Sequence, residues 1–204
     1  MKIQNSARLG IMGGTFDPIH IGHLIAASEV ARALDLSEVL FVPAGSPWQK
    51  SLYSSAEDRL MMTTLAVADH ERFSVSRIEI DRRGPTYSAD TVARLSDFYG
   101  EGAELFFILG SDAAAGLSTW MKLDEFTGKT NVVVVTRPGD PASAVEGADA
   151  TFVPMPLIDV SSTDIRARVR EGRPISYLVP PAVESYIRAN GLYSTQEEVK
   201  DAQA

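Results

Sequence analysis

The alternation of short apolar runs with helix-length segments constrains the fold of this chain most strongly. The clearest apolar runs cover residues 9–12, 39–42, 105–109 and 132–135. The last two are continuous and apolar, as strands that are buried on both faces of a parallel sheet tend to be. The strand–helix–strand order predicts an α/β protein with a Rossmann-like, doubly wound parallel sheet and a short helical part at the C-terminal end.

Two weaker runs and four helical segments complete this pattern. Residues 73–80 alternate apolar and polar side chains with one slip, and residues 151–154 are a sixth candidate strand. Small or apolar residues recur at helical spacing at Leu24, Ala27, Ala31 and Leu34, and again at Leu60, Thr64, Val67 and Ala68. A third helix over 89–99 should stop at Gly100, and a last one should begin at Pro181 and end before Gly191.

Length and charge set the broad class of the protein. The chain has 204 residues, of which 45% are hydrophobic, so we expect one domain over residues 1–194 and a flexible acidic tail over 195–204. Its formal net charge of −8 excludes the broad basic surface of a nucleic-acid binder and argues against an anionic membrane surface.

Several absences narrow the class further. The chain has no cysteine, which excludes disulfides, zinc–thiolate sites and thiol catalysis. Residues 1–7 are polar, unlike a signal peptide, and no apolar run reaches the ~18 residues of a membrane span. We therefore expect a soluble, cytoplasmic protein, and its oligomeric state, homo-oligomer or monomer, stays open.

The glycine-rich turn after the first apolar run carries the strongest chemical signal. Gly13 and Gly14 allow a sharp turn and a close approach of a ligand, and Thr15 and Phe16 follow them. Parallel sheets bind ligands beyond the carboxyl ends of their strands, where helix N-termini expose unpaired N–H groups. His20 and His23 are three residues apart and share a face of the first helical turn, where they form a donor pair suited to phosphate oxygens.

A second polar cluster runs from Ser161 to Arg166. Ser161 and Asp164 have the spacing of a capping box, so the cluster starts a helix on its simplest interpretation. The functional interpretation adds Ser162, Thr163 and Arg166 to the helix N–H groups as an anion-binding corner. The two interpretations are compatible, because capping the helix is what builds the corner. In the segment from Asp164 to Arg173, arginines outnumber acidic residues, which predicts a focused positive site on an acidic protein.

These two segments resemble the HxGH signature and the Ile-Ser-Ser-Thr-x-Ile-Arg motif of the nucleotidyltransferase superfamily, with Val160 in place of the leading Ile. Class I aminoacyl-tRNA synthetases share His-Ile-Gly-His, but they also need a lysine-rich Lys-Met-Ser-Lys-Ser loop and a tRNA-binding body, which this short, acidic chain lacks.

Further segments, in the same order along the chain, resemble the bacterial nicotinate mononucleotide adenylyltransferases. They are Arg82-Arg83-Gly84-Pro85-Thr86-Tyr87-Ser88 with Asp90-Thr91, Leu109-Gly110-Ser111-Asp112 followed by Trp120, and Thr136-Arg137-Pro138-Gly139. Read alone, Thr86–Ser88 could simply start a helix, Arg137–Gly139 could be a plain turn, and Trp120 could serve only packing. Their colinearity from Gly13 to Arg166 is stronger than any single match.

The resemblance implies an enzyme that transfers the adenylyl group of ATP to nicotinate mononucleotide, with a role for each matched residue. His20 and His23 would contact the α- and β-phosphates, and Lys50 would neutralise phosphate oxygens. ATP would also be bound by Gly13, Gly14, Thr15, Phe16, Gly110, Asp112, Ser162, Thr163 and Arg166. The mononucleotide would be bound by Thr86, Tyr87, Trp120 and Arg137. Mg²⁺ would arrive on the ATP rather than in a site of the protein, since no dense carboxylate cluster is visible.

One segment departs from the family pattern of Pro-x-His-Lys. The chain has Pro47-Trp48-Gln49-Lys50, in which Gln49 replaces the histidine and Trp48 has no assigned role. Two rivals stay open: a phosphopantetheine adenylyltransferase, which generally has Thr where His20 stands, and a nucleotide-binding sensor without catalysis.

Overall fold

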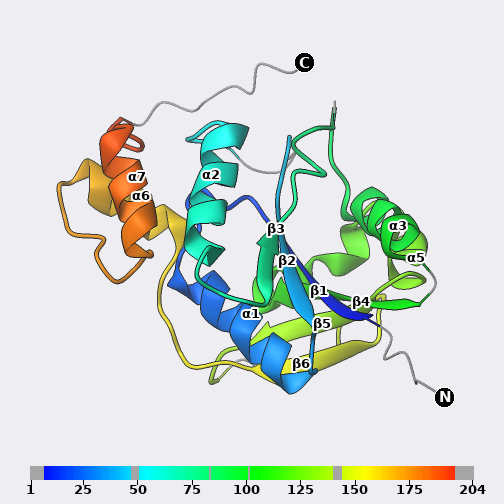
Figure 1. The fold of residues 1–204 in the computed structure, drawn as a ribbon. Helices are drawn as coiled ribbons and strands as arrows, with labels where there is room; N and C mark the ends of the chain where they lie inside the picture. Colours follow the sequence, from blue (N-terminus) through cyan, green and yellow to red (C-terminus); the bar gives the residue numbers. More distant parts are fainter. Residues whose placement is uncertain (1–6, 47–50, 83, 101, 140–143, 196–204) are drawn as a thin grey trace. The chain divides into compact units, whose positions relative to one another are not determined.

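The protein is an α/β structure built on one six-stranded sheet (Figure 1). This computed structural model describes residues 7–46, 51–82, 84–100, 102–139 and 144–195. The strands are β1 (Ala7–Gly14), β2 (Glu38–Pro43), β3 (Phe73–Val75), β4 (Ala103–Gly110), β5 (Asn131–Thr136) and β6 (Ala150–Pro154). Their order in the sheet is β3-β2-β1-β4-β5-β6, and the strand pairs from β1 to β6 through β4 and β5 are parallel. The predicted class, a Rossmann-like α/β fold with a parallel sheet, is confirmed.

Helical segments follow most of the strands. They are α1 (Ile21–Ala33), α2 (Ala56–Val67), α3 (Ser88–Tyr99), α4 (Ser111–Ala115), the 3₁₀ helix η1 (Leu117–Thr119), α5 (Leu123–Thr127), α6 (Ser162–Arg170) and α7 (Pro181–Ala189). As predicted, α3 is followed by Gly100, whose φ of 78° suits glycine, and α7 begins with Pro181. No helix in the described ranges is long and apolar enough to cross a bilayer.

The described chain divides into two compact units, each made of several segments. We call residues 1–13, 26–40 and 87–157 the sheet unit, and residues 14–25, 41–86 and 158–204 the turn unit. Strand β2 contributes residues to both.

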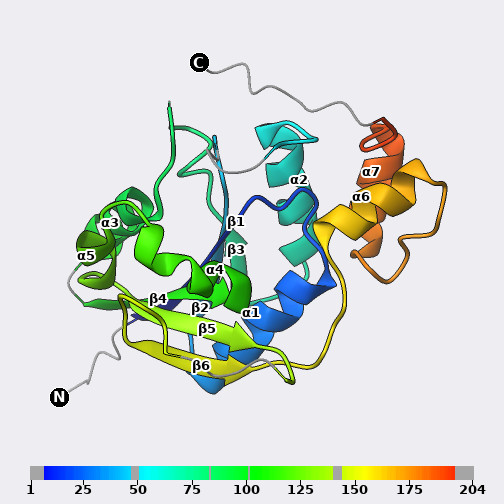
Figure 2. The ribbon, with the colours of Figure 1, turned by 180° about the vertical axis from the view of Figure 1, so that it is seen from behind.

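The core of the sheet unit lies in its central strands, which run side by side in Figure 2. Residues 105–109 of β4 and 132–135 of β5 are all buried, which matches their continuous apolar sequence. Strand β5 pairs with β4 from Phe106↔Asn131 to Gly110↔Val135, so Gly110 is at the carboxyl end of this pair. The sequence from Gly110 onward therefore leaves the sheet at the edge where parallel sheets bind ligands.

In the turn unit, α2 packs against α7, and the two helices lie side by side in Figure 1. Helix α2 starts with a full capping box, in which the Ser55 side chain accepts a hydrogen bond from the Asp58 backbone and the Asp58 carboxylate accepts one from the Ser55 backbone. The same carboxylate accepts a hydrogen bond from the Tyr186 hydroxyl of α7 at 2.9 Å, which joins the start of α2 to α7.

Two predictions about elements were wrong in part. The run over 73–80 is a strand only at Phe73–Val75, because the alternation slips there and the chain then forms a turn, closed by the bond from Asp81 N to Arg77 O. Ile80 is nevertheless buried, from within that turn.

The prediction of the buried face of α2 was also wrong. Of the predicted face, only Val67 is buried, while Thr64 and Ala68 are exposed. The helix instead buries Arg59, Met62, Thr63 and Val67. Apolar spacing could not reveal this, because two of the buried side chains are polar and stable there only through their hydrogen bonds.

Candidate active site

From Gly14 onward, the glycine-rich turn belongs to the turn unit, and it is shaped by Phe16. This residue is buried with a φ of 53°, and its ring contacts the rings of Phe41 and His23. A Cβ on Gly14 would lie 2.7 Å from the Phe16 ring, so a larger residue there would displace it. The glycine therefore serves the packing of Phe16 inside the turn, beside the bond from Ala44 N to Gly14 O.

His20 and His23 lie together as predicted. Their rings stack with centroids 3.8 Å apart, and the backbone N–H of His20 donates to Nδ1 of His23 at 3.2 Å. Because a backbone N–H can only donate, Nδ1 of His23 must be unprotonated, and the neutral ring then carries its proton on Nε2. His23 is half-buried and His20 is buried. A Cβ on Gly22 would be 3.1 Å from the His20 ring, so glycine at this position lets the first ring keep its place.

The predicted anion-binding corner at the start of α6 joins directly to this turn. Ser161 caps the helix by accepting a hydrogen bond from Asp164 N at 3.1 Å. The Ser162 hydroxyl donates to the Pro18 carbonyl at 2.8 Å, and Nη1 of Arg166 donates to the Asp17 carbonyl at 2.7 Å. Two segments separated by more than a hundred residues therefore form one local structure.

Two other basic residues of this segment are arranged differently from Arg166. Arg168 forms an ion pair with Asp164 at 2.6 Å, and Arg173 pairs with Glu171 at 2.7 Å. The predicted surplus of positive charge is thus partly neutralised within the segment, whereas Arg166 donates into the turn, to the Asp17 carbonyl.

Asp17 is a buried carboxylate that sequence reasoning did not single out. Its side chain accepts hydrogen bonds from the backbone N–H of Tyr53 at 2.7 Å, the hydroxyl of Ser54 at 2.6 Å and the hydroxyl of Tyr193 at 2.7 Å. Burial, together with the nearby Asp17 charge, raises the pKa of the Tyr193 phenol well above its usual value, so this hydroxyl stays a donor. No spacing rule connects these residues, and the residue types alone gave no signal.

Arg59 of α2 is fully buried beneath the same turn. Its guanidinium donates to the carbonyls of Thr15 and Gly45, each at 3.0 Å, and to that of Ala44. It therefore ties the glycine-rich turn to the loop after β2. The sequence could have suggested this only as an arginine one turn inside a predicted helix.

The sheet unit holds the other predicted ligands. Gly13 is the next-to-last residue of β1, and a Cβ on it would lie 3.1 Å from the Phe107 ring. Gly110 is the N-cap of α4, and Asp112 lies exposed in the first turn of that helix. The neighbouring Ser111 hydroxyl donates to Val135 O at 3.2 Å. The residues predicted for ATP thus divide between the two units.

Trp120 is half-buried in an aromatic cluster of the sheet unit. Its ring centroid lies 6.0 Å from that of Phe107 and 5.4 Å from that of Phe126, and Phe126 is fully buried. Trp120 therefore does take part in packing, as one of the two interpretations held, and part of its indole remains exposed.

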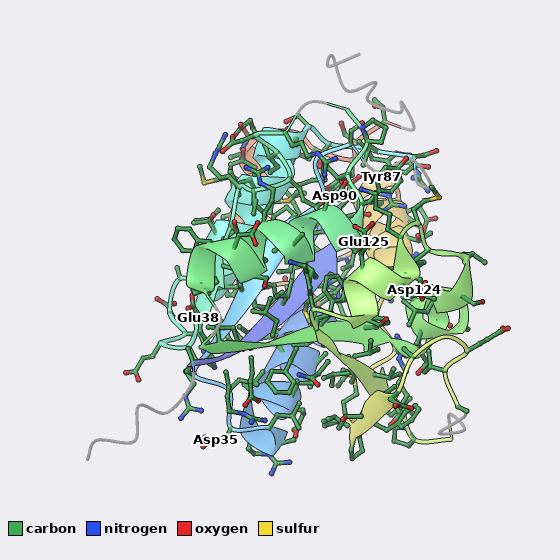
Figure 3. All side chains as sticks on the ribbon, turned by 90° about the vertical axis from the view of Figure 1, so that its right-hand side faces the viewer. Asp35, Glu38, Tyr87, Asp90, Asp124 and Glu125 are labelled. Carbon is green, nitrogen blue, oxygen red and sulfur yellow. The ribbon has the colours of Figure 1, made fainter. Side chains whose placement is uncertain are left out.

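The segment predicted to bind the pyridine carboxylate lies at the start of α3. Tyr87 is the N-cap residue, and Asp90 in the first turn pairs with Lys122 at 2.7 Å (Figure 3, where Tyr87 and Asp90 are labelled beside Asp124 and Glu125 of α5). Thr86 is buried. Thr86 to Ser88 do start a helix, as the simpler interpretation held, and this start also presents N–H groups of α3.

Arg137 and Lys50 are the remaining predicted site residues. Arg137 is exposed in the turn after β5, which Gly139 completes with a φ of 94°. Lys50, with Trp48 and Gln49, lies outside the described residues.

Comparison with known proteins decides the family. The cytidylyltransferase-like family model matches residues 11–168, which include both signature segments. The chain belongs to this family. A protein of Corynebacterium kroppenstedtii named "Probable nicotinate-nucleotide adenylyltransferase" is 52% identical over 201 residues, covering 96% of this chain and 95% of its own length. A protein of the same name from Leifsonia xyli subsp. xyli is 49% identical, covering 91% and 94%.

These relatives confirm the family predicted from the motifs, that of the nicotinate-nucleotide adenylyltransferases. A solved structure, that of Plasmodium falciparum nicotinic acid mononucleotide adenylyltransferase complexed with NaAD, matches the fold with a TM-score of 0.77. It covers 92% of this chain and 97% of its own at 18% identity, so the likeness supports the fold alone.

Proposed function

We propose that this chain transfers the adenylyl group of ATP to nicotinate mononucleotide, giving nicotinate adenine dinucleotide and pyrophosphate in NAD biosynthesis. The relatives at about half identity carry this activity in their names. The observation that carries the proposal for this chain is the junction between the two signature segments, where Ser162 and Arg166 of α6 donate to the carbonyls of Pro18 and Asp17. The junction gathers imidazole, guanidinium and hydroxyl donors in one unit, the donor types that bind phosphate oxygens.

The reaction needs no enzyme nucleophile. An oxygen of the mononucleotide phosphate attacks the α-phosphorus of ATP, and the bond from that phosphorus to the oxygen bridging to the β-phosphate breaks. The bonding electrons leave with pyrophosphate. Because the attacking phosphate is already ionised near neutral pH, catalysis rests on positioning and on stabilising charge.

The residues of the turn unit suit the phosphate side of this reaction. The Nε2–H of His23 would donate to an α-phosphate oxygen, with Nδ1 held by the His20 backbone. The N–H groups at the start of α6, with Thr163 and Arg166, would hold the leaving pyrophosphate. Gly14, Thr15 and Phe16 would shape the turn. Lys50 would add positive charge, a role that the sequence alone supports.

Except for Thr86, which belongs to the turn unit, the residues that would serve the two nucleosides lie in the sheet unit. Trp120 would stack on the pyridine ring, Thr86 and Tyr87 would bind its carboxylate, and Arg137 would anchor the mononucleotide. Gly13, Gly110 and Asp112 would contact ATP, with the carboxylate near a ribose hydroxyl or a metal-bound water.

Mg²⁺ would arrive bound to ATP. In the described ranges, no group of three or more His, Asp or Glu side chains is placed to hold a metal ion. The hydroxyl, imidazole and guanidinium donors of the site fit phosphate oxygens rather than a cation, which suits an ion bound by the triphosphate and water. When bound, the ion would supply charge that offsets the triphosphate.

Acceptor choice tests the proposal. The protein is incubated with ATP, Mg²⁺ and one acceptor at a time, and pyrophosphate release is measured. We expect release with nicotinate mononucleotide, a lower kcat/KM with nicotinamide mononucleotide, and none with phosphopantetheine. Equal kcat/KM for the two pyridine nucleotides would refute the role of Thr86 and Tyr87. Release with none of the acceptors would favour a nucleotide sensor.

A further inference from the structure

Tyr53 contacts the one arginine that leads from α6 into the glycine-rich turn. The guanidinium carbon of Arg166 lies 4.3 Å from the centroid of the Tyr53 ring. In the same position, Nη1 donates to the Asp17 carbonyl at 2.7 Å and Nη2 to the Thr163 hydroxyl at 3.3 Å. The guanidinium is thus held both in its plane, by hydrogen bonds, and on its face, by an aromatic ring.

Tyr53 is itself fixed through its backbone. Its N–H donates at 2.7 Å to Oδ2 of Asp17, whose side chain is only 3% exposed. Oδ1 of the same carboxylate accepts hydrogen bonds from the hydroxyls of Ser54 and Tyr193. Because the carboxylate is held by buried donors, it gives the backbone of Tyr53 a defined place. The ring is therefore presented to Arg166 by a support that does not depend on the ring.

A stacked ring acts on an arginine in a specific way. It attracts the cation from its face and restricts the flexible side chain, so it does not compete for the in-plane N–H groups beyond those already bonded to Asp17 and Thr163. An arginine that is already ordered loses less freedom when a phosphate binds. The benefit should therefore appear in the binding of the ligand of Arg166 and not in that of the other substrate.

We infer that Tyr53 is a positioning residue, which orients Arg166 to receive the triphosphate of ATP. This inference rests on the proposed function. Tyr53 lies outside both signature segments, in a stretch to which the motifs gave no role. Its predicted effect passes through Arg166 alone.

Steady-state kinetics on the full chain provide the first test. Tyr53→Leu should lower kcat/KM for ATP by about 3- to 10-fold, the range of a cation–π contact at a partly exposed site. The KM for nicotinate mononucleotide should stay within about twofold, and Tyr53→Phe, which keeps the ring, should match the parent. Tyr53→Gln provides a second variant without a ring. The matched control is Tyr177→Leu, at a tyrosine of the same unit that is 90% exposed. Equal changes for both substrates, or a loss in Tyr53→Phe as large as in Tyr53→Leu, would overturn the inference.

A double-mutant cycle separates positioning from general structural support. In an Arg166→Met background, Tyr53→Leu should change kcat/KM for ATP by less than about twofold, because the residue through which it acts is gone. If the two losses instead multiply, Tyr53 does not act through Arg166.

Calorimetric titration with Mg²⁺ and ATP, without acceptor, distinguishes this inference from the proposed function. Tyr53→Leu should weaken the Kd for ATP by the same factor of about 3 to 10. A parent that binds ATP but adenylylates no pyridine nucleotide would overturn the proposed function, while the weaker ATP binding of Tyr53→Leu would still support the role of Tyr53. An unchanged Kd for ATP in an active enzyme would overturn the inference alone.

Discussion

The two units hold their candidate ligands by different forces. In the turn unit, the groups suited to phosphates are fixed by hydrogen bonds to main-chain carbonyls and by the buried Asp17 carboxylate. In the sheet unit, Trp120 is fixed by aromatic packing against Phe107 and Phe126. Hydrogen bonds define direction, which a reacting phosphate requires, whereas apolar packing defines a surface, which suits a flat ring. The difference implies that substitutions in the turn unit should affect rate and stability, and those at Trp120 the affinity for one substrate.

Two arginines of the turn unit also show how an acidic chain can place positive charge at one turn. Arg59 reaches the carbonyls of Thr15 and Gly45, and Arg166 reaches that of Asp17, so both cations serve the turn itself. Arg168 and Arg173 face acidic neighbours instead. A net charge of −8 is therefore compatible with positive charge concentrated at one turn.

The largest effect is expected at the histidine pair. His23→Ala should lower kcat by about 10²–10³, the scale for one donor aimed at charge that develops in the transition state. Steady-state rates with both substrates saturating measure this, with circular dichroism to show that the variant folds. A matched control is His70→Ala, at an exposed histidine of the same unit whose ring stacks on Phe73. A kcat within about tenfold of the parent would contradict the assignment of His23 to the reacting phosphate.

The next effect concerns the Asp17 carboxylate. Tyr193→Phe removes one of its three donors and should lower the free energy of unfolding by about 1–3 kcal/mol, as measured by urea unfolding at pH 8. Tyr186→Phe, at a less buried tyrosine that donates to Asp58, should cost less. A loss no larger in Tyr193→Phe than in Tyr186→Phe would show that Asp17 does not need this hydroxyl.

The same tyrosine predicts a pH dependence. Its pKa is raised in the folded protein, so as the pH rises through ~10 the unfolded chain loses the phenolic proton first. The stabilisation is therefore fully present below pH ~10 and is lost above it. Above pH ~10, the free energy of unfolding of Tyr193→Phe should therefore fall less steeply with pH than that of the parent. Parallel curves of unfolding free energy against pH would contradict this.

The sequence predicted the strands, the helix cap and the histidine pair, which follow local patterns. It did not predict the polar side chains that are buried through distant hydrogen bonds. The continuous runs at 105–109 and 132–135 became β4 and β5, and Ser161 capped α6, because apolar burial and capping follow local rules. The meeting of His20 and His23 also followed from their spacing. Asp17 and Arg59 were missed because each is stable in the interior only through hydrogen-bond partners that lie far away in the sequence, such as Tyr193 and Gly45. The wrong face predicted for α2 has the same cause, since Arg59 and Thr63 are buried polar residues that a search for apolar spacing passes over.

The smallest expected effect tests the apolar side of the comparison. Trp120→Leu keeps an apolar side chain in the cluster but removes the flat ring, and the KM for nicotinate mononucleotide should rise by about 2- to 10-fold, which corresponds to the roughly 0.5–1.5 kcal/mol of an aromatic contact beyond burial. The KM for ATP should not change. Phe126→Leu is the control, because Phe126 is fully buried and packs against Trp120 without facing solvent. If Phe126→Leu raises the KM for the mononucleotide as much as Trp120→Leu does, the ring acts through the shape of the cluster and not by stacking on the pyridine. If instead the KM for ATP rises in Trp120→Leu, the division between a polar phosphate side and an apolar ring side fails.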